Sequence, residues 1–237
     1  TYTSIDGGAT WEGPSQVKYP SDDDGAAGDP VMAFDRQGKA YAASISLKTE
    51  EFAIGNAVGS AATSAIPIAT SQDGGRTWAE PVASARSHLK TSVMAAEGGR
   101  PRYELELPFL DKPWITVGPS RDDPAQDVIY VTYTKFVTHY EVFFTLDGLP
   151  YLGVPLTETS IEMVYSKDGG RTWSAPLAVS PTVIRTVGED APDRVGQGSQ
   201  PVVAPDGTLY VTWVDSTDDN AFKGLAEVYV ARSDNGG

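Results

Sequence analysis

The chain has 237 residues, enough for one large domain or two small ones, and 18 basic against 32 acidic residues give it a formal net charge of −14. This balance argues against sequence-independent nucleic-acid binding and against docking on anionic membranes, because both need a cationic surface. The sequence has no run of about 18 apolar residues and predicts no membrane-spanning helix. It has no cysteine, which excludes disulfides and thiolate metal sites, and only His88 and His139 could supply imidazoles, too few for a catalytic centre of three histidines.

Short runs rich in Val, Ile, Tyr and Thr alternate with Gly, Asp and Pro turns along the chain, which predicts an all-β protein. In chain order, strands are expected near 30–35, 40–47, 65–71 and 79–84, then near 113–118, 127–135, 160–166 and 174–180, and finally near 201–205, 208–215 and 226–233. The strands fall into units of four, and antiparallel four-stranded units in series are typical of the blades of a β-propeller.

An octet with the pattern Ser-x-Asp-Gly-Gly-x-Thr-Trp recurs between the third and fourth strands of these units. It occupies residues 4–11, 71–78 and 166–173, and a fourth copy starts at residues 233–237. The glycines allow positive φ in a tight hairpin, the aspartate can accept hydrogen bonds within its own turn, and the tryptophan can fill the space beneath. We therefore assign structural roles to Asp6, Trp11, Asp73, Trp78, Asp168, Trp173 and Asp234.

This octet resembles the Asp-box of bacterial neuraminidase (BNR) repeats, which occurs in sialidases and sialidase-like β-propellers. Together with the strand motifs, the resemblance covers essentially the whole chain. It implies a propeller whose Asp-box hairpins lie at the periphery, away from the active site. The same box occurs in propellers that bind ligands or join assemblies without catalysis, so the resemblance is more specific for the fold than for an activity.

A closed propeller needs about four to eight blades, and this chain supplies about three. We expect a single propeller segment in which residues 1–19 end one blade, residues 28–86 and 110–181 form two blades, and residues 197–237 form an incomplete blade. The remaining blades would come from a longer chain, giving a ring of six as in sialidases, or from a second copy of this chain.

Long connections are expected on one face of the propeller, near 20–29, 85–112 and 181–200 and near 48–64, 136–159 and 216–225. Long loops on a rigid scaffold often carry function, although they can also be variable decoration. The first contains Asp22, Asp23 and Asp24, which could bind Ca²⁺ through carboxylate oxygens or form a solvated acidic turn. No other cofactor is expected.

The candidate substrate-binding residues are Arg100, Arg102, Arg194 and Asp111, all in the connections of this face. A guanidinium can hold a carboxylate through two parallel hydrogen bonds, and the resemblance implies such a role because sialidases place three arginines around their substrate carboxylate. The alternative is that these arginines pair with neighbouring acidic residues.

The insert at residues 139–151 is expected to form an extra β-hairpin that turns at Asp147-Gly148. Its aromatic side chains could stack on sugar rings at the mouth of the propeller channel, or they could pack against the next blade or a partner.

Two departures from sialidases bear on activity. The Arg-Ile-Pro motif of that family is missing, and no Tyr/Glu nucleophile pair can be identified, because sequence neighbours such as Tyr103 and Glu104 point to opposite faces of a strand. No catalytic residue is therefore assigned.

Two functions remain open. The first is an extracellular or cell-surface, sialidase-like protein that engages a glycan or glycoprotein, with exo-glycosidase cleavage of terminal sialic-acid-type sugars as the activity that the resemblance implies. The second is a non-catalytic propeller that binds carbohydrate or protein, or is structural, in a secreted or surface assembly.

Overall fold

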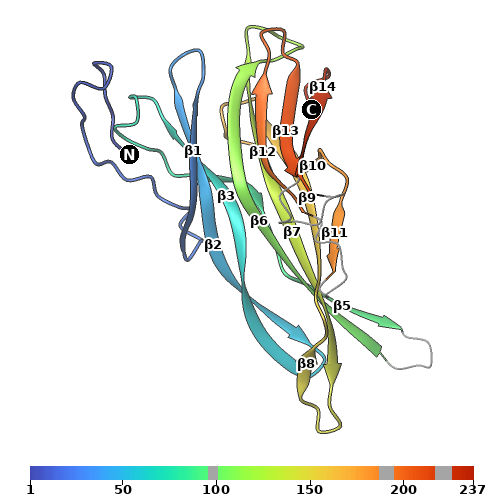
Figure 1. The fold of residues 1–237 in the computed structure, drawn as a ribbon. Helices are drawn as coiled ribbons and strands as arrows, with labels where there is room; N and C mark the ends of the chain where they lie inside the picture. The colour runs from blue at the N-terminus through green and yellow to red at the C-terminus, as the bar shows by residue number, and fades with distance from the viewer. Residues whose placement is uncertain (96–100, 187–194, 217–225) are drawn as a thin grey trace.

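The computed structural model describes residues 1–95, 101–186, 195–216 and 226–237 (Figure 1). These residues form fourteen strands and no helix, which confirms the predicted all-β class. Every strand pairing between them is antiparallel, in three separate sheets. No helix in these four described stretches is long and apolar enough to cross a membrane.

The first sheet is a four-stranded meander in the order β1-β2-β3-β4. Its strands are β1 (Gly25–Phe34), β2 (Ala40–Ile54), β3 (Ala57–Ser71) and β4 (Val82–Arg86). The central strands β2 and β3 are 15 residues each, and together they form one long curved hairpin (Figure 1). It turns at Gly55, whose φ of 58° suits a residue without a Cβ.

The second sheet has seven strands, five of them in the order β10-β9-β7-β6-β5, with β8 paired to β7 and β11 paired to β9. Their bounds are β5 (Lys90–Ala95), β6 (Pro101–Pro119), β7 (Asp127–Phe144), β8 (Pro150–Leu152), β9 (Leu156–Ser166), β10 (Leu177–Ala178) and β11 (Val183–Thr186). The third sheet contains β12 (Gly196–Val203), β13 (Leu209–Asp215) and β14 (Glu227–Ser233) in sequence order.

Strands β1, β6 and β12, one from each sheet, lie next to one another in the middle of the molecule, because β6 contacts both β1 and β12 (Figure 1). At Gly118 of β6, an added Cβ would come within 2.6 Å of Cβ of Val203, so a glycine allows the second and third sheets to approach closely. An ion pair of 2.6 Å between Arg36 Nε and Asp127 Oδ1 joins the first and second sheets.

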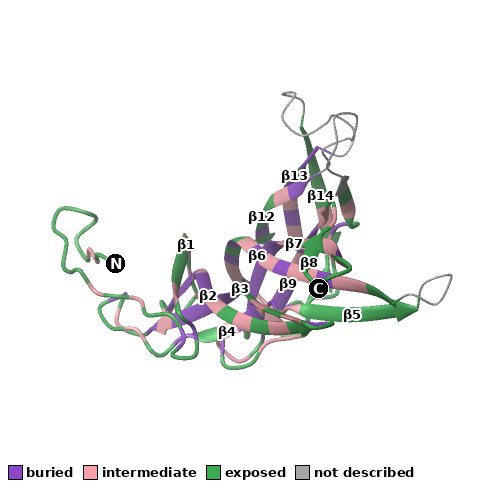
Figure 2. Ribbon diagram, turned by 90° about the horizontal axis from the view of Figure 1, so that it is seen from below, coloured by how far each residue is buried: buried purple, intermediate pink, exposed green. Residues whose placement is uncertain are grey.

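Strand β7 is buried on both of its faces, which explains its nearly continuous apolar sequence. Ile129, Val131 and Tyr133 belong to the core between the first and second sheets, whereas Val128 and Tyr130 belong to the core between the second and third. The alternation follows from the two-residue period of a strand. Figure 2 shows the buried residues concentrated in the middle of the sheets, whereas β5 is exposed. Each fully buried aliphatic side chain stabilises the fold by about 1.5–3 kcal/mol.

Three segments predicted as long connections are largely strands. Residues 48–64 belong to the β2–β3 hairpin, residues 85–112 hold β5 and much of β6, and residues 136–159 hold the end of β7, β8 and the start of β9. The prediction of loops was wrong there because ladder pairing continues beyond the main cores. A third small core of Ile54, Leu105 and Val142 stabilises these extensions.

Candidate functional site

The Asp-box turns follow the ends of β3 and β9, and their aspartates bond within the turn. In the copy after β3, Oδ1 of Asp73 accepts hydrogen bonds from Ser71 Oγ at 2.7 Å and from the Thr77 N–H at 2.9 Å. Oδ2 accepts from Thr77 Oγ1 at 2.6 Å, and the Gly75 N–H donates to Ser71 Oγ at 2.8 Å. The same bonds recur around Asp6 and Asp168.

These hydrogen bonds favour the charged carboxylates. The hydroxyl of Thr10, followed by its backbone N–H, lowers the pKa of Asp6 from 3.8 to about 2. The corresponding hydroxyls of Thr77 and Thr172 hold the pKa of Asp73 and Asp168 well below the usual range. A carboxylate whose acceptors are occupied within its own turn is suited to holding that turn, and this geometry fits the structural role assigned to the box aspartates.

Each box tryptophan lies over the second glycine of its turn. A Cβ at Gly75 would be 3.4 Å from the ring of Trp78, and the corresponding distances to the rings of Trp11 and Trp173 are 3.8 Å. Trp173 also packs against the core between the first two sheets. Trp11 is 63% exposed, so in that copy the ring covers the turn without filling an interior.

The fourth, incomplete copy corrects one assignment. Oγ of Ser233 donates to the side-chain oxygen of Asn235 at 2.7 Å, which is the bond that Ser71 makes to Asp73. Asn235, and not Asp234, therefore occupies the position of the box aspartate. Asp234 forms an ion pair of 3.3 Å with Arg232 instead. The assignment of Asp234 from the sequence is therefore wrong by one residue.

The acidic triplet 22–24 is used for structural contacts. Asp23 is buried, and its two carboxylate oxygens accept hydrogen bonds from Ser46 Oγ and from Nη1 of Arg86. Asp24 accepts a bond of 2.6 Å from the Thr49 N–H. Within the part of the chain that the structure describes, the triplet does not form a group able to share one metal ion.

Of the four predicted substrate-binding residues, the structure describes only Arg102 and Asp111, and it does not bring these two together. Arg100 and Arg194 lie outside the described residues, and Arg102 and Asp111 both lie on β6 rather than in a loop. They are nine positions apart, about 30 Å along a strand. Asp111 forms an ion pair of 2.8 Å with Lys112, whereas Arg102 lies at the end of β6 that reaches into the long extensions.

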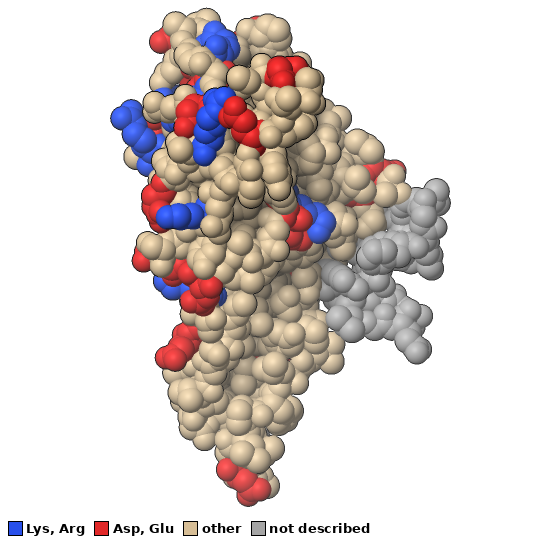
Figure 3. Space-filling model, turned by 90° about the vertical axis from the view of Figure 1, so that its left-hand side faces the viewer, with Lys and Arg blue, Asp and Glu red and all other residues tan. Residues whose placement is uncertain are grey.

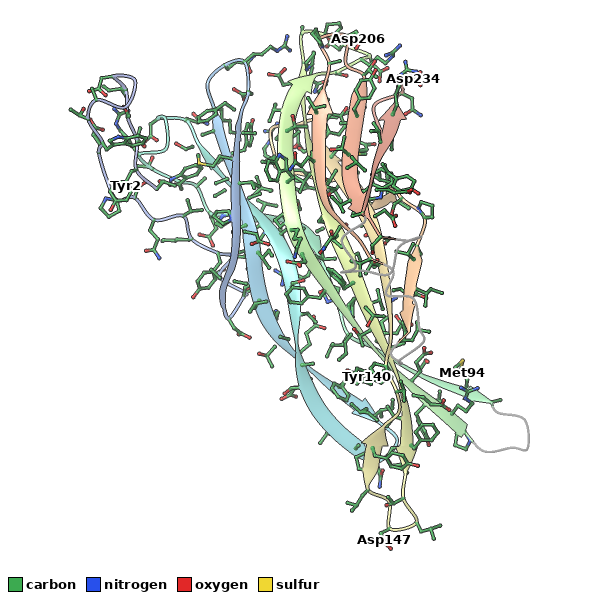
Figure 4. The ribbon with its side chains drawn as sticks, viewed as in Figure 1. Tyr2, Met94, Tyr140, Asp147, Asp206 and Asp234 are labelled. Carbon is green, nitrogen blue, oxygen red and sulfur yellow. The ribbon has the colours of Figure 1, made fainter. Side chains whose placement is uncertain are left out.

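Arg102 lines an open groove of about 690 Å³ at this end of the molecule. The groove is bounded by Gly55 and Asn56 at the tip of the β2–β3 hairpin, by the start of β6, and by the hairpin at residues 141–151. Asn56 Nδ2 donates to the Gly148 carbonyl at 3.1 Å, which connects the two hairpin tips. Figure 4 shows that the hairpin tip at Asp147 lies at one end of the molecule. Asp206, in a short turn, and Asp234, in the fourth Asp-box copy, lie at the opposite end.

Aromatic side chains line this groove from both faces of β7. Phe143 and Tyr151 stack with their ring centroids 5.3 Å apart and their planes at 20°, and they are 37% and 53% exposed. Tyr103 and Phe144 meet edge to face at 5.2 Å, and Phe144 packs directly on Gly55. The second pair packs on the small core of Ile54, Leu105 and Val142, and the first presents an exposed aromatic platform on the other face of β7.

The polar part of the groove is a bidentate ion pair. Nε and Nη2 of Arg102 donate to the two carboxylate oxygens of Glu141 at 2.9 and 3.1 Å. The guanidinium therefore already has a carboxylate partner within the protein, as the alternative interpretation of the arginines expected. Figure 3 shows basic and acidic side chains interspersed on one face of the molecule.

The sequence analysis did not identify a Tyr–Glu pair that lines a second pocket. Tyr133 and Glu162 are opposite each other on β7 and β9, and the Tyr133 hydroxyl donates to Oε2 of Glu162 at 3.1 Å. Lys135 Nζ binds the other oxygen of Glu162 at 2.8 Å. The three residues line a pocket of about 390 Å³. Burial, followed by the charge of Glu162, raises the pKa of the Tyr133 hydroxyl far above its usual range.

No model of a known protein family matches the chain, and no curated protein matches it significantly. Among solved structures, a protein of unknown function from Dyadobacter fermentans matches 95% of this chain and 70% of its own at 14% identity. The TM-score of 0.28 is too low for that likeness to support an argument about the fold or the site.

Proposed function

We propose that the chain is part of a sialidase-like, Asp-box β-propeller that binds glycans in the groove between its long hairpins without hydrolysing them. The stacked, exposed pair of Phe143 and Tyr151 beside the Arg102–Glu141 ion pair carries this proposal. Aromatic faces with a few fixed polar groups are typical of ligand grooves of this size, and they suit sugar rings, which present C–H faces and hydroxyl edges.

Several features support the propeller as the scaffold. The main strands of each sheet pair in chain order, β1, β6 and β12 lie side by side, and Asp-box turns follow β3, β9 and β14. The register also repeats, since the box serine pairs with a residue at or near the start of β2, β7 and β13. The three pairs are Ser71 with Ala40, Ser166 with Ile129 and Ser233 with Leu209.

Exposed valines on the third sheet support the presence of a further packing partner in the proposed ring. Val202, Val214, Val228 and Val230 are 42–70% exposed on its strands, and contiguous apolar surface is usually covered by another structural element. Further blades, from a longer chain or from a second copy, would cover this surface. The acidic, lysine-poor composition and the Asp-box resemblance lead us to propose an extracellular or cell-surface location.

The groove favours neutral sugars over acidic ones. Glu141 occupies the donor edge of Arg102, so a sugar carboxylate would have to displace an existing bidentate partner and would meet the charge of Glu141. Sugar hydroxyls can instead donate to Glu141 and accept from the remaining guanidinium N–H groups. This distinguishes the proposed site from a triad of arginines around a sialic acid carboxylate.

Hydrolysis is the second candidate, and the Tyr133–Glu162 pair favours it. A tyrosine nucleophile activated by a glutamate is the arrangement that the family resemblance implies. The raised pKa of Tyr133 opposes this role, because a buried phenol beside a carboxylate ionises with difficulty. If the pair were catalytic, Tyr133→Phe would abolish sialoside turnover and leave glycan binding in the groove unchanged.

A glycan array followed by mass spectrometry tests the proposal. The chain is expected to retain neutral oligosaccharides, and the bound glycans should be recovered with unchanged mass. Release of a terminal sugar would favour hydrolysis instead. The absence of both binding and sugar release for every glycan, in a sample shown to be folded by its cooperative thermal unfolding, would contradict both candidates.

A further inference from the structure

A cluster of metal-binding side chains lies on β6 and β7, beyond the glycan groove. Glu104 and Glu106 are two positions apart on β6 and therefore share one face of the strand. His139 on β7 pairs directly with Glu106. One ligand atom from each of the three residues lies within 4.8 Å of the other two. Neighbouring strands of a paired sheet thus hold two carboxylates and one imidazole in one place.

The spacing suits ligands of a common ion. His139 Nδ1 lies 3.1 Å from Oε1 of Glu104. Two ligand atoms that bind a tetrahedral Zn²⁺ at about 2.0–2.1 Å lie about 3.3 Å apart. Lys90 Nζ, 3.4 Å from Oε2 of Glu106, is the competing cation, but its side chain is 71% exposed and can turn into solvent.

The other imidazole nitrogen gives an independent indication. Nε2 of His139 is buried and has no hydrogen-bond partner among the residues described, and it faces Oε2 of Glu158 at 3.6 Å. A histidine that binds a metal through one nitrogen usually directs the N–H of the other toward a carboxylate. Binding through Nδ1 would place the proton on Nε2, where Glu158 can orient the ring. The carboxylate, imidazole and orienting carboxylate come from β6, β7 and β9.

We propose that Glu104, Glu106 and His139 bind a divalent transition-metal ion, with Zn²⁺ favoured. A mixed set of imidazole and carboxylate ligands suits first-row transition metals better than Ca²⁺, which prefers oxygen ligands alone, and Zn²⁺ binds such sites more tightly than Mn²⁺. Glu106 and His139 also line the pocket of about 390 Å³, so water can complete the coordination. The ion would link β6 to β7 two residues from Arg102. It would thereby stabilise the paired ends of these two strands, which also carry the groove.

Isothermal titration of chelator-treated protein with ZnCl₂ tests the site, with CoCl₂ as a spectroscopic probe. We expect one Zn²⁺ per chain, a higher thermal unfolding midpoint with Zn²⁺, and visible Co²⁺ absorption bands that Zn²⁺ removes. His139→Gln and Glu106→Gln should each weaken Zn²⁺ binding at least about tenfold, and Glu158→Gln should weaken it by about 10- to 100-fold through the orientation of His139.

His88 provides the matched control. Its Nδ1 lies 2.7 Å from Oε1 of Glu50, so it forms a similar His–Glu pair but does not belong to a group of three ligands within the described residues. His88→Gln should leave Zn²⁺ affinity unchanged. The proposal is overturned if wild-type protein binds no Zn²⁺, if folded His139→Gln binds Zn²⁺ as tightly as wild type, or if His88→Gln loses binding equally.

Discussion

Arg102 and Glu141 form a bidentate ion pair across β6 and β7, with N–O distances of 2.9 and 3.1 Å. The pair lies in the aromatic groove, so the charge that could recognise an acidic ligand is already compensated by the protein itself. This ion pair determines which sugars the proposed site favours. Replacing Glu141 with glutamine would remove its charge and keep the side-chain volume nearly the same.

Glu141→Gln should shift the groove toward acidic glycans. The substitution removes the negative charge while keeping the side-chain shape, and it leaves the guanidinium of Arg102 free to bind a ligand carboxylate. One additional charge-assisted hydrogen bond contributes about 1.5 kcal/mol, which corresponds to about a tenfold lower Kd for an acidic sugar. Calorimetry with matched neutral and sialylated oligosaccharides measures the change. Glu51→Gln, an exposed carboxylate on β2, controls for net charge; equal shifts in both variants would refute the mechanism.

Asp23→Ala should strongly destabilise the chain. The carboxylate is buried, and its removal leaves Arg86, whose side chain is 21% exposed, without its partner. Breaking a buried ion pair from one side costs about 3–5 kcal/mol. Urea unfolding measures this loss. The exposed neighbour Asp22→Ala should change the free energy of unfolding by less than about 0.5 kcal/mol. Equal effects would mean that the acidic triplet acts as one site.

Gly207→Ala tests the contact between the second and third sheets. Gly207 has a φ of 80°, and an added Cβ would lie 2.6 Å from the backbone of Arg121. We expect a loss of about 2 kcal/mol or more, because strain and overpacking combine. Gly198→Ala is the matched control, since its φ of 70° is similar but nothing lies within 4 Å of its Cβ position. That variant should lose about 1 kcal/mol. Similar losses in thermal unfolding would show that the close contact is unimportant.

The Asp-boxes should contribute to acid unfolding. The pKa of Asp6 is about 2 in the folded chain against an ordinary value of 3.8, so its stabilising effect is complete above about pH 4 and is lost as the pH falls toward 2. Thr10→Val removes the hydroxyl that lowers this pKa most. The variant should be less stable at neutral pH and should lose less stability on acidification. Thermal unfolding between pH 7 and 2 tests this, with Thr91→Val as a control outside the boxes; parallel curves for wild type and Thr10→Val would contradict it.

The sequence predicts the repeated turns and the central strands well because both depend on local chemistry. Asp73 bonds to residues within four positions of it, and the core positions of β7 follow the two-residue period of a strand. Asp234 was assigned in place of Asn235 because the fourth copy is incomplete and has an aspartate directly before the residue that occupies the box position.

The candidate sites depend on pairings that a local pattern does not contain. Arg102 and Glu141 are separated by 39 positions, and Tyr133 and Glu162 by 29. The long hairpins were predicted as loops because their stability comes from partner strands and from a small core rather than from apolar runs. The expected strand near 127–135 did not reveal this pair, because aligning the box serine Ser166 with residue 127 would place Tyr133 opposite Ser160, whereas Ser166 pairs with Ile129 in the structure.

The most direct test of the account is the affinity of Tyr151→Ala for the neutral glycan that binds best in the array. Removing one ring of the stacked pair should raise the Kd at least about tenfold, because truncating an aromatic residue on which a ligand packs commonly costs about 2 kcal/mol or more. Tyr229→Ala, which removes one ring of the stacked Trp213–Tyr229 pair on the third sheet, should leave the Kd unchanged. An unchanged Kd in folded Tyr151→Ala, or an equal loss in Tyr229→Ala, would contradict glycan binding in this groove.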